Sequence, residues 1–138
     1  MKRSASLILV ELLIMLTVFA VSAALCLRAF VWSDNKAKEC AAKDFALVQT
    51  QNAAETLKHC RGDFSQAAQN YGGWWDGTSW DIFYDDSWNV TGEEAVYILR
   101  VVPQTDETNC LGKAKLTLVD REDTVLAELS VCWQEVVP

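Results

Sequence analysis

The hydrophobic pattern divides the chain into two parts that suit different solvents. Residues 7–32 are almost wholly apolar and are interrupted only by Glu11 and Arg28. A membrane-spanning helix needs about 20 mostly apolar residues, so this stretch is long enough to cross a bilayer. The short basic segment 1–6 before it predicts an N-terminus on the cytoplasmic side. The rest of the chain, residues 33–138, is then expected outside the membrane.

Helical periodicity continues beyond the apolar stretch. Residues 37–60 contain no glycine or proline, and Gly62 is typical of the position that follows a helix C-terminus. The apolar side chains that fall on one broad half of a helical wheel predict the face toward the core: Ala37, Cys40, Ala41, Phe45, Leu47, Val48 and Ala54. A single helix over residues 7–60 would be about 80 Å long. The alternative is a second helix that begins at residues 33–35, since Ser, Asp and Asn are good N-caps.

Short alternating segments in the second part predict a small antiparallel sheet. Asp63 is expected to cap a short helix over residues 64–71, which two glycines end. Strands are predicted over residues 80–84, 95–102, 113–119 and 124–133, with a hairpin turn at 120–123. The predicted fold class is therefore α+β: a long N-terminal helix whose apolar half packs against three or four antiparallel strands.

Charge is distributed as unevenly as hydrophobicity. The whole chain of 138 residues carries a net charge of -7, but residues 62–138 contain 14 acidic and only 4 basic residues, a net charge of -10. A nucleic-acid-binding surface needs basic residues for the phosphates, so direct binding of nucleic acid by this part is not expected. The apolar share of 51% also excludes a disordered chain.

Glu11 distinguishes the roles that the apolar stretch can have. The stretch fits a cleaved signal peptide, with Ser22 and Ala24 as the small residues before the cut, or a plain membrane anchor. A carboxylate at this place costs about 2.5–3.5 kcal/mol on insertion scales, and neither role uses it. Because residues 7 and 15 are Leu and Met, no ion pair one turn away neutralises it. Its partner is expected from another chain or from a new N-terminus.

The run of residues 6–13 resembles the processing site of type IV prepilins and pseudopilins. In that family a short basic leader is cut immediately before an apolar helix, and a Glu is the fifth mature residue. With Glu11 in that place, the resemblance implies a cut between Ser6 and Leu7 and methylation of the new Leu7 amine. The chain departs from the usual pattern at both residues, where the family has Gly and then Phe or Met. Residues 83–89 are also similar to minor pilin-like proteins of Gram-positive bacteria.

The resemblance implies a structural role, and no catalytic motif in the sequence predicts an enzymatic one. The expected function is that of a minor pilin or pseudopilin in a type IV pilus, a type II secretion pseudopilus or a DNA-uptake pseudopilus. Glu11 would neutralise the Leu7 amine of a neighbouring subunit during assembly. Implied partners are other pilin subunits, a prepilin peptidase, the lipids of the bacterial cytoplasmic membrane and an assembly-platform membrane protein. The implied organisation is a leader at 1–6, a transmembrane half of the helix at 7–32 and an extracytoplasmic head at 33–138.

Four cysteines outside the apolar stretch suit an oxidising compartment: Cys40, Cys60, Cys110 and Cys132. On one continuous helix Cys40 and Cys60 would lie about 30 Å apart, far beyond the roughly 7 Å between Cα atoms that a disulfide allows. Cys110 and Cys132 flank the last predicted hairpin, so they can pair with each other or each with a helix cysteine. At least one such disulfide is predicted, with buried free thiols as the alternative.

Aromatic residues concentrate between positions 74 and 88, where the candidates for a contact surface are Trp74, Trp75, Trp80 and Trp88. An exposed aromatic strip would bind a sugar or a protein, which gives the alternative function of a secreted or membrane-anchored ligand-binding domain. Packing inside a small domain is the favoured interpretation. Neighbours on a strand point to opposite faces, so one of Trp74 and Trp75 is expected to stay exposed.

Nothing in the sequence predicts a catalytic, metal or cofactor site. Acidic residues gather in the aromatic region, but they lack the spacing of an EF-hand calcium loop: Asp76, Asp81, Asp85, Asp86, Glu93 and Glu94. The cysteines are too far apart in sequence for a zinc site. His59 and its neighbour Cys60 would point about 100° apart on a helix, which does not suit a catalytic pair. No nucleophile elbow, phosphate loop or metalloprotease motif occurs.

Overall fold

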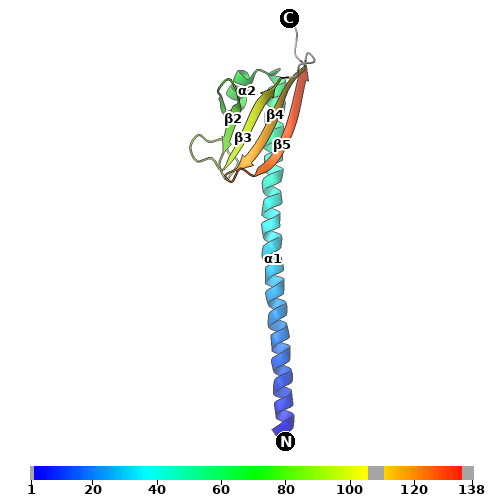
Figure 1. Ribbon diagram of the computed structural model, residues 1–138. Helices are drawn as coiled ribbons and strands as arrows, with labels where there is room; N and C mark the ends of the chain where they lie inside the picture. Colours follow the sequence, from blue (N-terminus) through cyan, green and yellow to red (C-terminus); the bar gives the residue numbers. More distant parts are fainter. Residues whose placement is uncertain (1, 106–110, 135–138) are drawn as a thin grey trace. The chain divides into compact units, whose positions relative to one another are not determined.

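The computed structural model describes residues 2–105 and 111–134 (Figure 1). The chain forms two compact units, residues 1–40 and 41–138, each of which is described by itself. Helix α1, Lys2–His59, provides the whole of the first unit and the beginning of the second. This helix is continuous across residues 33–35, so the alternative of a second helix that begins there is wrong.

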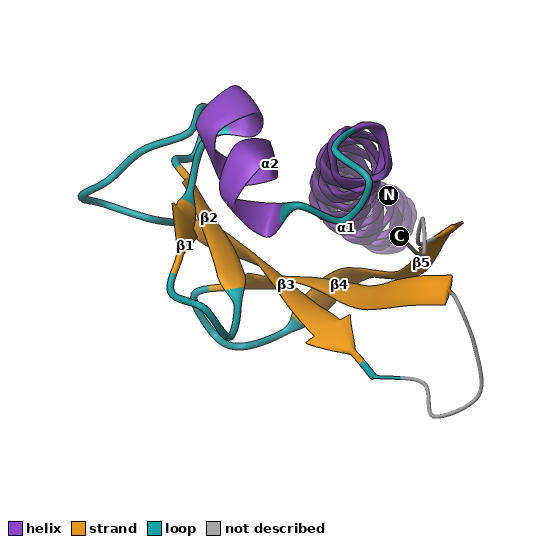
Figure 2. Ribbon diagram, turned by 90° about the horizontal axis from the view of Figure 1, so that it is seen from above, coloured by secondary structure: helices purple, strands orange, loops and turns teal. Residues whose placement is uncertain are grey.

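The second unit is an α+β head made of the last part of α1, a short helix and one antiparallel sheet. Helix α2, Phe64–Tyr71, has the predicted bounds. The strands are β1 (Trp74–Trp75), β2 (Trp80–Tyr84), β3 (Tyr97–Gln104), β4 (Leu111–Asp120) and β5 (Val125–Gln134), and they lie in the sheet in chain order. Figure 2 shows both helices over the same face of the sheet. The α+β class is confirmed, but the sheet has five strands and not three or four.

The prediction omits one strand and misplaces the ends of three others, β3, β4 and β5, which are expected over 95–102, 113–119 and 124–133. The missed strand, β1, has only two residues, Trp74 opposite Asp81 and Trp75 opposite Trp80, and is too short to show an alternating pattern. The predicted end of β3 before Pro103 is wrong, because the strand runs through this residue to Gln104. Strand β2 pairs only with residues 97–101 of β3, so Pro103 has a paired neighbour in β4 alone. Proline is tolerated at such a place, where a strand has a neighbour on one side only.

The face of α1 that packs on the sheet is not the predicted one. The buried positions carry mostly small residues: Ala46, Thr50, Ala53, Ala54 and Leu57. Of the predicted core positions only Ala54 is among them, and the larger ones, Phe45, Leu47 and Val48, are exposed. Ala37, Cys40 and Ala41 are exposed as well. The helical wheel predicted the core-facing side from the large apolar residues, whereas the helix contacts the sheet mainly through small ones.

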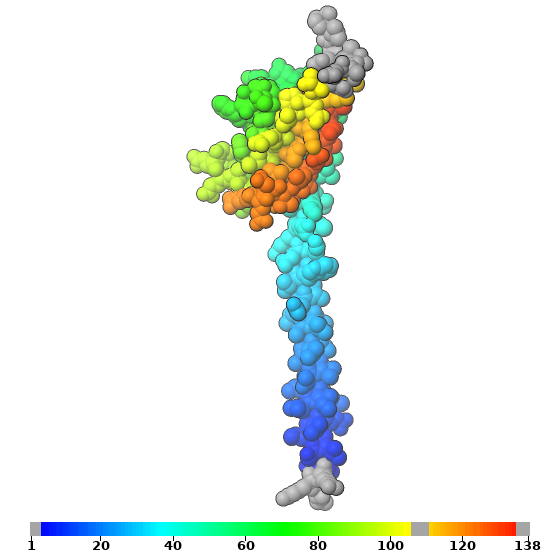
Figure 3. Space-filling view, viewed as in Figure 1, coloured from blue at the N-terminus to red at the C-terminus, as the bar shows by residue number. Residues whose placement is uncertain are grey.

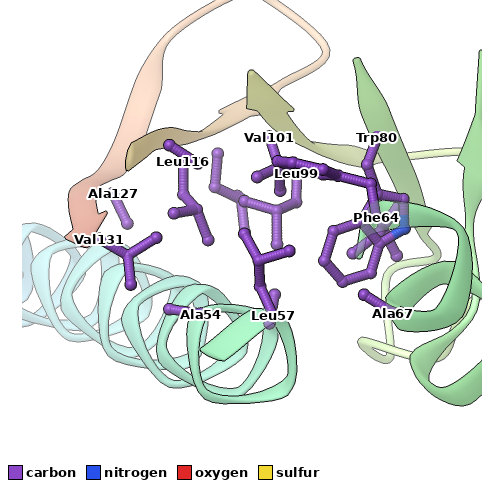
Figure 4. Close-up of a cluster of buried hydrophobic side chains, with 14 of the residues drawn as sticks. Ala54, Leu57, Phe64, Ala67, Trp80, Leu99, Val101, Leu116, Ala127 and Val131 are labelled. Carbon is purple, nitrogen blue, oxygen red and sulfur yellow. The ribbon is translucent and has the colours of Figure 1, made fainter. Parts of the chain in front are cut away.

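The core lies between the two helices and the inner face of the sheet. Figure 4 shows Leu57 of α1 and Phe64 of α2 directed toward Trp80, Leu99 and Leu116 of the central strands. Burial alternates along the strands, as in β2, where every second residue is buried. This alternation is the pattern of a sheet with one face on a core and one face in solvent.

Turn residues fix the junction between the helices. The side chain of Asp63 caps α2 by accepting a hydrogen bond from the backbone N–H of Gln66 at 3.0 Å, as predicted. Gly62 has φ +82°, a conformation that favours glycine, and its N–H donates to the carbonyl of Leu57 at the end of α1. A Cβ atom at Gly62 or at Gly112 would lie 2.2 Å from the indole of Trp133. The Trp133 ring therefore packs in a space that these two glycines leave open.

A chain of hydrogen bonds ties α1, α2 and β2 together. The hydroxyl of Tyr84 donates to the hydroxyl of Tyr71 at 3.1 Å, which in turn donates to Oε1 of Gln49 at 2.7 Å. Tyr84 is only 1% exposed. Burial raises the pKa of both tyrosines, so both hydroxyls stay protonated and can donate at neutral pH.

Removing the middle of this chain is expected to cost more than removing its end. Tyr71→Phe leaves the buried Tyr84 hydroxyl without an acceptor and should lower the free energy of unfolding by about 1–3 kcal/mol. Tyr84→Phe leaves the bond from Tyr71 to Gln49 intact and should cost about 1 kcal/mol or less. Thermal unfolding of the detergent-solubilised variants measures both losses. A larger loss in Tyr84→Phe than in Tyr71→Phe would contradict this order.

Candidate functional site

The predicted processing and assembly residues lie in the first unit. Ser6, Leu7 and Glu11 are all helical residues of α1. Every described side chain from residue 4 to residue 40 is exposed, and Figure 3 shows this segment in blue to cyan. Within the described part of the chain, the Glu11 carboxylate has no hydrogen-bond or ion-pair partner. A charge is thus presented on an apolar helix surface.

The other polar side chains of the apolar stretch are satisfied by the helix itself. The hydroxyl of Thr17 donates to the carbonyl of Leu13, and that of Ser22 donates to the carbonyl of Val18, both at 2.8 Å. This back-bonding is how a helix accommodates hydroxyls where no water is present. The described helix contains a window long and apolar enough for a single membrane span or a signal sequence. The charged side chains of this stretch, by contrast, have no partner within the described part of the helix.

Arg28 is the other such charge, and sequence reasoning gave it no role. It is exposed on α1 and makes no hydrogen bond or ion pair to any described residue. Its side chain lines a shallow surface groove with Leu27, Val31, Trp32 and Asn35. Its positive charge could have indicated a role from sequence alone, because Arg28 is the one basic residue in residues 7–32 and Glu11 is the one acidic residue.

The four candidate tryptophans do not share one surface. Trp80 is fully buried, and its indole N–H donates to the carbonyl of Gly72 at 2.9 Å. Trp75 stacks on Phe64 of α2, with ring centroids 4.7 Å apart. Trp74, its neighbour on β1, points the other way and is 71% exposed. One member of this pair is thus exposed, as strand geometry requires.

Trp88 packs the loop between β2 and β3 against the head. Its ring stacks on Tyr97 of β3 with centroids 4.1 Å apart and planes 6° apart, and it faces Phe45 of α1 at 6.1 Å. The residue has φ +64°, which is uncommon outside glycine. The preceding Asp85 supports this backbone by accepting hydrogen bonds from the N–H groups of Ser87 and Asn89. Trp88 therefore holds the loop in place and presents no open aromatic strip.

The acidic residues of the same region shape loops and pair with a base. Hydrogen bonds from backbone N–H groups hold the pKa of Asp85 below its usual value, and the N–H of Ser79 does the same for Asp76. Asp81 forms a two-pronged salt bridge with Arg100, at 3.0 and 3.1 Å. Among the described residues no group of three His, Cys, Asp or Glu side chains is arranged to hold a metal ion.

The four described cysteines differ in their exposure, and all of them are free thiols. Cys26 and Cys40 are exposed on α1, and Cys132 is exposed on β5. Cys60, the residue that follows the last residue of α1, is buried. The amide of Asn70 donates to Sγ of Cys60 at 3.6 Å. Cys110, on which the predicted pairings depended, lies outside the described residues. A disulfide of the head stays a prediction.

Comparison with known proteins identifies no relative. No protein-family model matches this chain, and no curated protein and no solved structure matches it. The function proposed below therefore depends on the residues and contacts of the chain itself.

Replacing the packed Trp88 and the exposed Trp74 in turn tests where the structure places these two side chains. Trp88→Ala should lower the free energy of unfolding by at least about 2 kcal/mol, because it removes the stack on Tyr97 and the contact with Phe45. Trp74→Ala, the matched control, should change it by no more than about 0.5 kcal/mol because that ring is exposed. Thermal unfolding followed by near-ultraviolet circular dichroism measures both. Similar losses in the two variants would contradict the packing described for Trp88.

Proposed function

We propose that this chain is a structural subunit, a minor pilin or pseudopilin, of a type IV pilus, a type II secretion pseudopilus or a DNA-uptake pseudopilus. In this proposal residues 7–32 anchor it in the bacterial cytoplasmic membrane, with the head outside. Residues 1–6 are a leader that a prepilin peptidase removes. The subunit then joins a filament through α1 by way of an assembly-platform membrane protein.

The observation that carries the proposal is the Glu11 side chain. It is a lone acid on the apolar part of α1, exposed and without a partner among the described residues, while nearby hydroxyls are satisfied within the helix. A buried charge is tolerated when a group of opposite sign pairs with it. A signal peptide or a plain anchor gives Glu11 no such partner, whereas a bundle of sister helices does.

The head supports an assembly role through the exposed side of α1. Phe45, Leu47 and Val48 are exposed apolar residues on a helix whose small residues face the sheet. A helix that packs on its own domain on one side and on sister helices on another needs apolar residues on both. The acidic surface of the head, with a net charge of -10 over residues 62–138, opposes direct contact with nucleic acid.

The ligand-binding alternative has less support from the same contacts. Trp75, Trp80 and Trp88 are held within the head by stacking or burial, which leaves Trp74 as the exposed member of the four. One exposed tryptophan does not make the strip on which that alternative was based.

Intact-mass spectrometry of the chain from bacterial membranes tests the processing step. The expected product lacks residues 1–6 and carries one additional methyl group on the Leu7 amine. Ser6→Gly, which restores the usual family residue, should be processed at least as completely and serves as the positive control. A cut near Ala24 or an intact N-terminus would overturn the proposal.

A second measurement tests the role of Glu11 in assembly. Glu11→Ala removes the charge and should leave cleavage intact, but incorporation into filaments should fall at least about tenfold because the pairing energy is lost. Glu11→Asp keeps the charge and is the control that should retain part of the incorporation. Immunoblots of sheared filaments against membranes give the ratio. Unchanged incorporation of Glu11→Ala would contradict the role of Glu11 in assembly, on which the proposal depends.

A further inference from the structure

Glu11 and Arg28 are the only charges in residues 7–32, and they have opposite signs. They are separated by 17 positions, which is about 25 Å along an α-helix, and they point about 100° apart around its axis. The two side chains therefore cannot pair within one chain. Each needs a partner from outside the helix that carries it.

In a membrane the two charges of one copy lie near opposite surfaces. The hydrocarbon layer is about 30 Å thick, so a separation of about 25 Å allows each side chain to reach the polar region nearest to it. Trp32 and Asn35, beside Arg28 in one surface groove, are residues that suit this boundary. Two parallel copies in the same register would keep Glu11 and Arg28 apart and would place like charges level with each other.

We propose that Arg28 of one copy pairs with Glu11 of a second copy that is displaced outward by about 25 Å along the helix axis. This inference rests on the proposed function, because a filament is what moves one copy outward past the next. The displacement brings the carboxylate of the outer copy level with the guanidinium of the inner one. A guanidinium can hold a carboxylate through two parallel hydrogen bonds, which suits an apolar surrounding. An ionised carboxylate has about four acceptor sites, two on each oxygen, so the Leu7 amine of another copy can share it with the guanidinium.

The axial displacement determines the kind of contact. When the Glu11 of the outer copy is level with the Arg28 of the inner copy, the outer Arg28 lies about 50 Å beyond the inner Glu11, so two neighbours form one charge pair and not two. Each copy offers Arg28 to the copy ahead and Glu11 to the copy behind. Such a head-to-tail contact uses two different surfaces and does not close on itself, so it repeats along a helical filament. The charge pair thus specifies both an axial displacement and a direction of growth.

Cross-linking between two kinds of copy tests the displacement. In the full-length chain with Cys26→Ser, one copy carries Met15→Cys and the other carries Val31→Cys. Both positions are exposed on α1, one turn beyond Glu11 and Arg28 respectively. In the displaced arrangement they lie at nearly the same level and on the same side of the contact. Co-expressed copies should form a disulfide-linked dimer in assembled filaments when a mild oxidant is added.

Matched variants separate the charge pair from simple proximity. Arg28→Gln should lower the yield of this dimer at least about tenfold, whereas Arg28→Lys, which keeps the charge, should retain it. The parent with Cys26→Ser alone controls for cross-links through the cysteines of the head. Copies that all carry Met15→Cys control for helices in the same register. A dimer from these control copies in place of the mixed pair, or an equal yield with Arg28→Gln, would overturn the inference.

The outcome is distinguishable from failure of the proposed function. If the chain is processed and incorporated but the mixed dimer does not form, the displacement is wrong and the filament role stands. If the chain is neither cleaved after Ser6 nor incorporated, the filament role is wrong and the inference falls with it.

Discussion

The head depends on the buried contact between α1 and the inner face of the sheet. The contact is made by Ala46, Thr50, Ala53 and Ala54, with Leu57 as the one large aliphatic side chain, and all five are buried. Ala53, Ala54 and Leu57 belong to one buried cluster with Trp80, Leu99 and Leu116 of the central strands. The hydroxyl of Thr50 is accommodated because it donates to the carbonyl of Ala46 within the helix. The rest of the head is arranged around this contact, with α2 and its tyrosine chain closing one side.

The same helix keeps apolar surface exposed beyond its contacts with the head. Phe45, Leu47 and Val48 are exposed in the second unit, and every described side chain of residues 4–40 is exposed in the first. Water is a poor solvent for such a surface, and contiguous exposed apolar surface is typical of interaction sites. In the proposed filament, lipid and sister helices replace water along this surface. The two charges on it then set which arrangements of neighbouring helices are acceptable.

Local signals predicted much of the head. Asp63 and the glycines around α2 gave its bounds, because caps depend on neighbours in sequence, and β2 has its predicted bounds. The buried face of α1 could not be predicted this way. A helical wheel ranks positions by hydrophobicity and cannot tell which apolar face meets the sheet and which meets other molecules.

Some residues of the candidate site could likewise be predicted from the sequence, and others could not. Glu11 could be singled out from sequence because a carboxylate in an apolar run is conspicuous without any structure. The fate of the tryptophans could not, since Trp74 and Trp75 are adjacent yet one is exposed and the other stacks on Phe64. Only the pairing of β1 with β2 decides which of them points inward.

The order of the strands has a consequence for how the head forms. Each strand of the sheet pairs with the strand next to it in the chain, from β1 to β5, and α1 and α2 precede them directly. Contacts of this kind close short loops, and proteins rich in them fold faster than those built on distant pairings. Each hairpin can therefore form as soon as its second strand is available. No strand has to wait, with its edge uncovered, for a partner from a remote part of the sequence.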